Sequence, residues 1–284
     1  MGYGIARSVL GAGHKVHGFD INPEQMTRFL AQGGEPGLLD DVAGSLDAVI
    51  CVVLNGAQTQ SVLGPLMSKL RKETVVISCA TLQPALARQL ASDADGFGLH
   101  YLDAPISGGA AKAAGGALSV MASGSAQAFA AAKPSLDAMA QTVFDLGDQP
   151  GAGSSMKAVN QLLAGVHIAS MAEAMTFGMT QGVTPKQFVE VISQCAGTSW
   201  MLENRAPHIV DGDYTPLSAV DIWLKDLGIV LDIAKDAKFG APITAAALQQ
   251  FVAASGQGLG GEDDAAVAKV YARNAGLTLP GEAS

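Results

Sequence analysis

The chain has 284 residues, a length that fits one large or two ordinary domains and excludes collagen, short disulfide-rich proteins and isolated motifs. Hydrophobic residues make up 49% of the chain and charged residues 15%, which excludes a disordered protein because so apolar a chain can bury a large core. The 17 basic and 26 acidic residues give a net charge of −9, which repels polyanions. We therefore expect no nucleic-acid partner.

The cysteines and the hydropathy pattern bear on location. Cys51, Cys79 and Cys195 lie far apart, at no spacing typical of a zinc site or a disulfide framework. No continuous apolar run reaches the roughly 18 residues that cross a membrane, and the N-terminus lacks a basic-then-apolar signal. These observations predict a soluble, cytoplasmic protein with no metal site and no membrane partner.

Up to about residue 151, short apolar runs rich in β-branched residues alternate with helical segments. The expected strands cover residues 14–19, 48–54, 74–78, 101–106, 118–122 and 143–146, and helices over 23–32, 57–70 and 84–91 separate several of them. Strands that are apolar throughout are typical of a parallel sheet covered by helices on both faces. The pattern predicts an α/β domain over residues 1–151, built as a doubly wound parallel sheet of the Rossmann type.

After residue 151 the pattern becomes helical. Residues 154–181 keep helical periodicity almost without a break, and Thr184, Pro185 and Gln187 form the capping-box start of another helix. Further helices are expected over 220–237 and 243–254. The sequence thus predicts an all-α domain over residues 152–284, which begins with a long bridging helix.

The first twenty residues resemble part of a dinucleotide-binding unit. A helical segment is followed by an apparent strand that ends at Asp20, where such units use an acidic residue to hold the ribose hydroxyls of the adenosine. Gly2 stands where the last glycine of a G-x-G-x-x-G turn would stand. The first strand and the first two glycines of such a unit are missing from the sequence, and we expect them to precede Met1 in the native protein.

Three motifs carry a family resemblance. DAPISGG at residues 103–109, GSSMKAVNQ at 153–161 and DIWLKDL at 221–227 resemble, in this order, the signatures of the β-hydroxyacid dehydrogenase family, which includes 3-hydroxyisobutyrate dehydrogenase. Segments around them, at 161–169, 173–175, 225–232 and 261–264, resemble a branch that oxidises 2-hydroxy acids. The resemblance implies an NAD-dependent enzyme that oxidises a small hydroxy acid.

The same resemblance implies that Lys157 is the catalytic acid/base. Oxidation of a secondary alcohol needs a base for the hydroxyl proton while hydride leaves to a nicotinamide. An ordinary lysine, with a pKa of about 10.4, is almost fully protonated at neutral pH. We therefore expect burial between the domains, or a nearby cation such as Lys225, to lower the pKa of Lys157.

Two further groups are expected to hold the substrate. Asn160 and Gln161 lie three and four residues after Lys157 and share its helix face, so their amides can orient the substrate. Some family members carry Asn where this chain has Gln161, which leaves the division of labour between the two amides open. The carboxylate is expected to bind where a strand ends, at a hydroxyl and two glycines whose backbone N–H groups can approach an anion closely. These residues are Ser107, Gly108 and Gly109.

For the cofactor, the resemblance places Leu54 and Asn55 at a strand end that faces the dinucleotide, although the family commonly has Leu-Pro there. Thr81 is the position that touches the nicotinamide side, and Lys225 closes over the cofactor from the helical domain. Asp20 would repel a 2′-phosphate, and no arginine follows it directly, so NAD is favoured over NADP.

Other conspicuous side chains are given structural interpretations. The five histidines have no metal-ligand spacing and receive no catalytic role. Trp200 and Trp223 are expected to be core or interface residues, and Asp263 with Asp264 to be a solvated acidic turn. The long apolar helix must be covered, which together with the resemblance predicts a homodimer or homotetramer.

The interpretation leaves alternatives open. Within the family, the substrate could be 3-hydroxyisobutyrate or tartronate semialdehyde. Outside enzymes, a non-catalytic dinucleotide-binding relative would keep the fold, but the intact Lys157 argues against that possibility.

Overall fold

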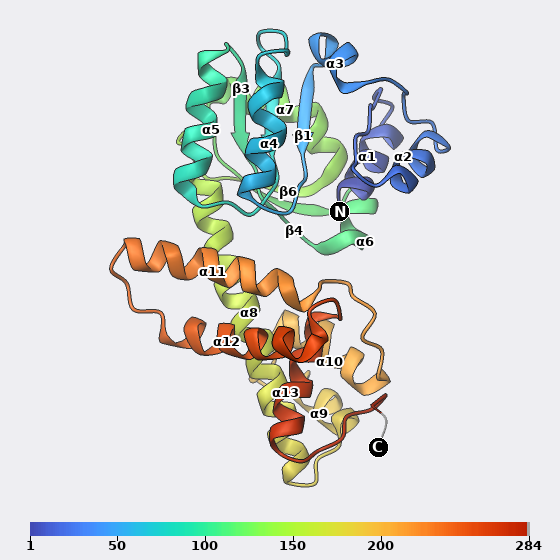
Figure 1. Cartoon of the computed structure of the whole chain (residues 1–284), viewed down its shortest axis with the longest axis vertical. Helices are drawn as coiled ribbons and strands as arrows, with labels where there is room; N and C mark the ends of the chain where they lie inside the picture. Colours follow the sequence, from blue (N-terminus) through green and yellow to red (C-terminus); the bar gives the residue numbers. More distant parts are fainter. Residues whose placement is uncertain (283–284) are drawn as a thin grey trace. The chain divides into compact units, whose positions relative to one another are not determined.

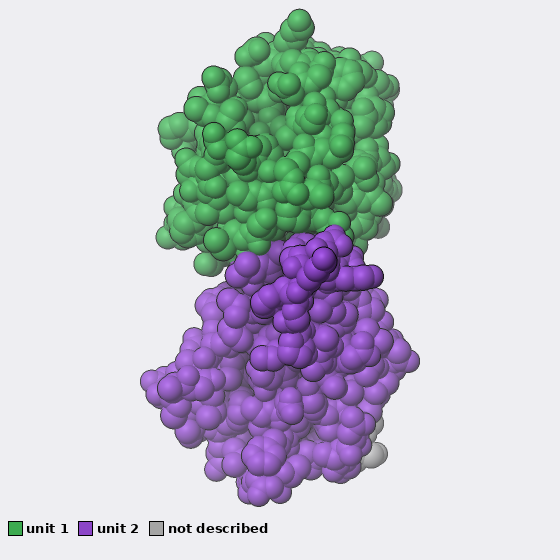
Figure 2. Space-filling model, turned by 90° about the vertical axis from the view of Figure 1, so that its left-hand side faces the viewer, with its two compact units in different colours: residues 1–157 green, residues 158–284 purple. Residues whose placement is uncertain are grey.

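The computed structural model describes residues 1–282. The chain forms two compact units, the first comprising Met1–Lys157 and the second beginning at Ala158, coloured green and purple in Figure 2. One helix, α8 (Ala152–Thr180), contributes residues to both units. Each unit has its own hydrophobic core.

The first unit contains two small sheets. In one, strands β1 (Ala48–Cys51), β2 (Val75–Ser78) and β3 (His100–Asp103) are parallel and lie in that order; β1 and β3 are labelled in Figure 1. In the other, β5 (Leu118–Ala122) pairs antiparallel with β4 (Ile106–Ser107) and parallel with β6 (Ala140–Asp145). A single antiparallel bridge between Asp103 and Ser123 links the two.

Helices cover both faces of the parallel sheet, as the apolar strands predict. Alternate residues of a strand point to opposite faces, so Val76 packs with α4 (Gly56–Met67) and α5 (Pro84–Gly96), while Val75 and Ile77 pack with α1 (Gly2–Gly11) and α7 (Ala126–Met139). The remaining helices of this unit are α2 (Pro23–Leu30), α3 (Leu39–Val42), a 3₁₀ turn (Ala43–Ser45) and α6 (Gly109–Ala114).

Two of the predicted strands differ from the structure in more than the position of their ends. Residues 14–19 form no strand and make one isolated parallel bridge, between His17 and Glu35, because in the described residues they have no neighbouring strand to extend the pairing. The predicted strand 101–106 is divided into β3 and β4, since Pro105 between them has no N–H to donate to a ladder. The antiparallel pairing of β4 with β5 also departs from the expected all-parallel sheet.

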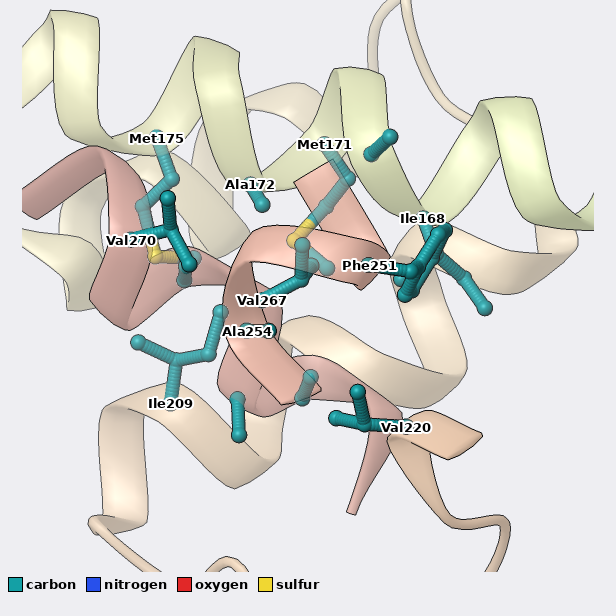
Figure 3. Packing of buried hydrophobic residues seen from close by; sticks show 14 of the residues in the cluster. Ile168, Met171, Ala172, Met175, Ile209, Val220, Phe251, Ala254, Val267 and Val270 are labelled. Carbon is teal, nitrogen blue, oxygen red and sulfur yellow. The ribbon is translucent and has the colours of Figure 1, made fainter. Parts of the chain in front are cut away.

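The second unit is helical, and its helices enclose one face of α8. They are α9 (Pro185–Ile192), α10 (Trp200–Asp211), α11 (Val220–Asp236), α12 (Pro242–Ala254), a π-helical turn (Ser255–Leu259), a 3₁₀ turn (Asp264–Ala266) and α13 (Val267–Asn274). Thr184 caps α9 through the predicted capping box. In Figure 3, Ile168, Met171 and Met175 of α8 lie among side chains such as Phe251 and Val267.

Helix α8 meets the length and hydropathy criteria for crossing a membrane, with a mean hydropathy of 1.3 over its best window. Polar residues spread along α8 interrupt its apolar runs, which is why no continuous apolar run was found in the sequence, but its length and mean hydropathy still meet these criteria. A core helix of a soluble protein passes the same test, and Ile168, Met171 and Met175 are buried in the core of the second unit. Other apolar residues of α8, Val159, Leu163 and Phe177, are 49–66% exposed.

The prediction of a solvated acidic turn at 263–264 is wrong. Asp263 and Asp264 are fully buried. Asp264 accepts hydrogen bonds from Arg205 Nε (2.5 Å) and from Trp223 Nε1 (2.8 Å), while Asp263 accepts one from the backbone N–H of Leu217 (2.9 Å). This local sequence looked solvated because its partners come from distant positions. Trp223 is a core residue as predicted, whereas Trp200 is 57% exposed.

Candidate active site

Lys157 is buried near the beginning of α8, with 8% of its surface exposed. The start of this helix is held by the carboxylate of Asp103, the last residue of β3. Asp103 Oδ2 accepts hydrogen bonds from the backbone N–H groups of Gly151 (2.9 Å) and Ser154 (2.8 Å), and Oδ1 accepts one from Ser154 Oγ (2.7 Å). Asp103 and Ser154 are both fully buried. Orphan N–H groups of the first turn are thereby satisfied by a distant side chain.

Gly153 and Ser123 are two small residues at the place where the start of α8 packs against the strands. A Cβ at Gly153 would lie 2.4 Å from the carbonyl oxygen of Met121 and 2.7 Å from that of Asp103, so no larger residue fits there without a backbone shift. Ser123 accepts a hydrogen bond from Gly153 N at 3.0 Å and donates a longer one, 3.4 Å, to Asp103. Burial raises the pKa of Asp103, and the hydrogen bonds from Ser154, Gly151 and Ser123 oppose that rise.

The predicted substrate loop follows directly from the same strand. After Asp103 the chain runs through β4 to Ser107, which is partly exposed, and then turns into α6. Gly108 and Gly109 have φ angles of +133° and +76°, values in the region that glycine adopts without strain. The loop and the helix that carries Lys157 therefore both connect to Asp103, one through its backbone and the other through its side chain.

The predicted cofactor residues Leu54, Asn55 and Thr81 follow the carboxyl ends of β1 and β2. Leu54 is 53% exposed, and Thr81 is partly exposed. Asn55 is the N-cap of α4, because its Oδ1 accepts the N–H of Gln58 (2.9 Å). A proline could not make this contact, so Asn55 has a local structural role. An exposed leucine at the carboxyl edge of a parallel sheet suits a planar ring, so these residues fit a dinucleotide.

Gly2 and Asp20 lie at the other predicted cofactor positions. A Cβ at Gly2 would lie 3.4 Å from Cβ of Val52, so the start of α1 packs closely against the residues that follow β1. Asp20 is exposed, and its Oδ1 accepts the N–H of Asn22 (2.8 Å) ahead of α2. An exposed carboxylate in this position fits a ribose diol.

In the second unit, Asn160, Gln161 and Lys225 are connected through Asp226. Asn160 Nδ2 donates to Gln161 Oε1 (2.9 Å), Gln161 Nε2 donates to Asp226 Oδ2 (2.5 Å), and Lys225 Nζ pairs with Asp226 Oδ1 (2.5 Å). A carboxylate only accepts hydrogen bonds, so Asp226 fixes which end of the Gln161 amide faces it. Gln161 and Asp226 are buried. Asp226 was not predicted as a site residue, although it stands next to Lys225 in the third motif.

A parallel sheet with a nucleotide-compatible carboxyl edge, a glycine loop and a buried lysine on the adjoining helix defines a nicotinamide-dependent dehydrogenase. Two protein-family models match the chain: the NAD-binding domain of 6-phosphogluconate dehydrogenase over residues 1–147, and the NAD-binding domain of NADP-dependent 3-hydroxyisobutyrate dehydrogenase over residues 151–271.

Curated relatives agree over the full length. A Cupriavidus necator protein named L-threonate dehydrogenase is 49% identical over all of this chain and 96% of its own length, and one of the same name from Escherichia coli K12 is 45% identical over 100% and 95%. A solved Salmonella typhimurium structure, named as a 3-hydroxyisobutyrate dehydrogenase, is 46% identical over 95% of both chains with a TM-score of 0.90. The chain belongs to the 3-hydroxyisobutyrate dehydrogenase family, and it is an oxidoreductase with the predicted Rossmann-type fold.

Proposed function

We propose that this enzyme oxidises L-threonate at its 2-hydroxyl group with NAD as the hydride acceptor. The observation that carries the reaction type is Lys157, a buried amine on the helix that is anchored to the strand leading into the Ser107–Gly109 loop. The substrate is supported by five relatives at 44–49% identity, all named L-threonate dehydrogenase.

In this proposal the protein's own residues bind the substrate and move one proton. The Ser107 hydroxyl and the backbone N–H groups of Gly108 and Gly109 bind the carboxylate, and the Asn160 amide orients the 2-hydroxyl. Bound NAD supplies the acceptor for the hydride that leaves C2. Lys157 Nζ takes the hydroxyl proton as the C2 carbonyl forms, so the products are a 2-oxo acid, the reduced cofactor and a protonated amine.

The preference for NAD over NADP is part of the proposal. Asp20 is an exposed carboxylate at the predicted ribose position, and it would repel the 2′-phosphate of NADP. Replacing Asp20 by Ser should lower the ratio of the KM for NADP to the KM for NAD, because it removes the repulsion between Asp20 and the 2′-phosphate. If the ratio does not change, Asp20 does not select the cofactor.

A substrate panel tests the proposed reaction. L-Threonate, 3-hydroxyisobutyrate, L-serine and, in the reducing direction, tartronate semialdehyde should be compared by kcat/KM at the nicotinamide absorbance. We expect L-threonate with NAD to give the highest value. A higher value for 3-hydroxyisobutyrate would favour the activity for which the Salmonella relative is named.

Lys157→Ala tests the proposed base. Loss of a positioned general base lowers kcat by about 100-fold or more, while cofactor binding measured by nicotinamide fluorescence should persist. Unchanged turnover would contradict the role of Lys157. No turnover of any substrate by the parent protein, with dinucleotide binding intact, would favour a non-catalytic relative.

We also propose that the enzyme is a cytoplasmic homodimer or homotetramer. The exposed apolar side chains Val159, Leu163 and Phe177 on α8 support association, because monomers seldom leave such a stripe uncovered. Light scattering coupled to size exclusion tests the oligomer, and cell fractionation tests the location. A monomer at micromolar concentration would contradict the proposed homodimer or homotetramer.

A further inference from the structure

We infer that Asp103 is a positioning residue for the reaction: its buried carboxylate fixes the first turns of α8 and thereby sets the place of the Lys157 amine. This inference rests on the proposed function, in which Lys157 is the base. Its evidence is independent of that function, because it consists of contacts within the first unit.

The carboxylate of Asp103 is buried and is held by hydrogen bonds from the start of α8. Three hydrogen bonds of 2.7–2.9 Å reach it from two residues at the start of α8, Gly151 and Ser154, and a fourth, of 3.4 Å, comes from Ser123. All of these donors are neutral N–H or O–H groups. They satisfy both carboxylate oxygens, and no exposed side chain takes part.

The anchor lies one helical turn before the amine. Ser154 and Lys157 are three residues apart on α8, so they stand on neighbouring turns of one face. A helix held at Ser154 by two bonds to one carboxylate cannot rotate or slide without breaking them. The close approach at Gly153 restrains the same turn from another side, because its Cα faces the carbonyl oxygens of Met121 and Asp103.

Asp103 also begins the path to the substrate loop. The backbone of Asp103 exchanges hydrogen bonds with Ser123 (2.8 and 3.0 Å), and the chain then passes through β4 to Ser107. The same residue thus connects the proposed base with the proposed carboxylate site. A misplacement of the order of 1 Å lowers the rate of an enzyme about 100-fold, so this connection matters for turnover.

Two neighbouring serines provide a matched pair of variants. Ser154 is fully buried and donates to Asp103, whereas Ser155 is exposed and donates to the carbonyl oxygen of Gly151 (2.8 Å), the residue directly before α8. Ser154→Ala removes one anchoring bond and keeps the carboxylate. We expect about a tenfold lower kcat for Ser154→Ala with KM for L-threonate within about threefold, and no comparable change for Ser155→Ala.

Asp103→Asn should have a larger effect on kcat than Ser154→Ala. Its amide replaces one acceptor oxygen by an NH₂ group, which leaves N–H or O–H donors at the start of α8 without an acceptor. We expect a kcat reduction of about 100-fold at saturating substrate. Ser125→Ala removes an ordinary side-chain cap, that of α7, and serves as the control for helix-cap loss in the same unit. Its kcat should stay within about twofold of the parent.

Combination with Lys157→Ala separates positioning from general stability. If Asp103 acts through Lys157, then Asp103→Asn combined with Lys157→Ala should have the residual kcat of Lys157→Ala alone. A further loss in the double variant would overturn the inference, and so would a KM effect without a kcat effect, or an unchanged kcat in Ser154→Ala. Unchanged turnover in Lys157→Ala alone would instead refute the proposed function, so the two failures are distinguishable.

Discussion

Asp103 in the first unit and Asp264 in the second are both buried carboxylates, but different donors stabilise them. Asp103 is surrounded by neutral donors, the N–H and O–H groups of Gly151, Ser154 and Ser123. Asp264 forms an ion pair with Arg205 and accepts a further bond from Trp223. Burial raises the pKa of both carboxyls. The difference shows that a buried charge can be held either by oriented dipoles or by a buried counter-ion.

The largest effect on stability should come from the ion pair. Arg205→Met keeps similar volume but leaves Asp263 and Asp264 buried without the cation, which costs about 3–5 kcal/mol in unfolding free energy. Urea unfolding measures the loss. Lys133→Met, which breaks an exposed pair with Asp137, should cost no more than about 1 kcal/mol. Equal losses in the two variants would contradict a role for burial.

At the dipole-stabilised carboxylate, the close packing can be broken without changing any charge. Gly153→Ala places a methyl group against two backbone carbonyl oxygens, and we expect a cost of about 2 kcal/mol together with a lower kcat. Gly228→Ala in α11 is the control, because nothing lies within 4 Å of its added Cβ. The control should be neutral or slightly more stable. A Gly153→Ala variant with parent stability would show that α8 can shift freely.

A smaller effect is expected when the ion pair keeps its cation but loses its neutral donor. Trp223→Phe removes the Nε1 hydrogen bond to Asp264 Oδ2 and keeps an aromatic ring near Phe251, so it should cost about 1.5 kcal/mol. Thermal unfolding checks this value. A loss as large as that of Arg205→Met would mean that the neutral donor matters as much as the cation.

The smallest effect is a pH dependence. Burial raises the pKa of Asp103 above its ordinary 3.8. The carboxyl group of Asp103 therefore binds its proton more tightly in the folded protein than in the unfolded chain. The contribution of this carboxyl to stability is therefore complete below pH 3.8 and is lost as pH rises through its folded-state pKa. The stability advantage of the parent over Asp103→Asn should thus shrink as pH is raised in urea titrations. An advantage that grows with pH would give the opposite sign.

Local sequence signals predicted much of the fold. The capping box at Thr184 and the apolar run at β5 agree with the structure, because a cap and a buried strand depend mainly on adjacent residues. The expected strand over residues 14–19 failed, since a strand needs a neighbouring strand and the described chain gives it one bridge. Helix α10 (Trp200–Asp211) was not predicted; Pro207 lies inside it and interrupts its pattern.

The same distinction between local and distant signals applies to the candidate site. Lys157, Ser107 and the two glycines after it were predicted because each stands in a short motif whose residue types themselves suggest the chemistry. Asp103 and Asp226 were quoted within those motifs but received no role, because their partners lie 48–51 and 65 residues away. Likewise, the burial of Asp264 depends on Arg205, 59 residues distant. Sequence spacing cannot reveal such pairs, since only the folded chain brings them together.

The anchoring of α8 has a consequence for the order in which the protein matures. The carboxylate that satisfies the first turn of this helix lies about fifty positions earlier in the chain, so the bond can form only after the intervening loop has closed. The amine of Lys157, the proposed base, therefore takes its final position only after β3 has been brought against the start of α8, so we expect assembly of this part of the first unit to precede activity.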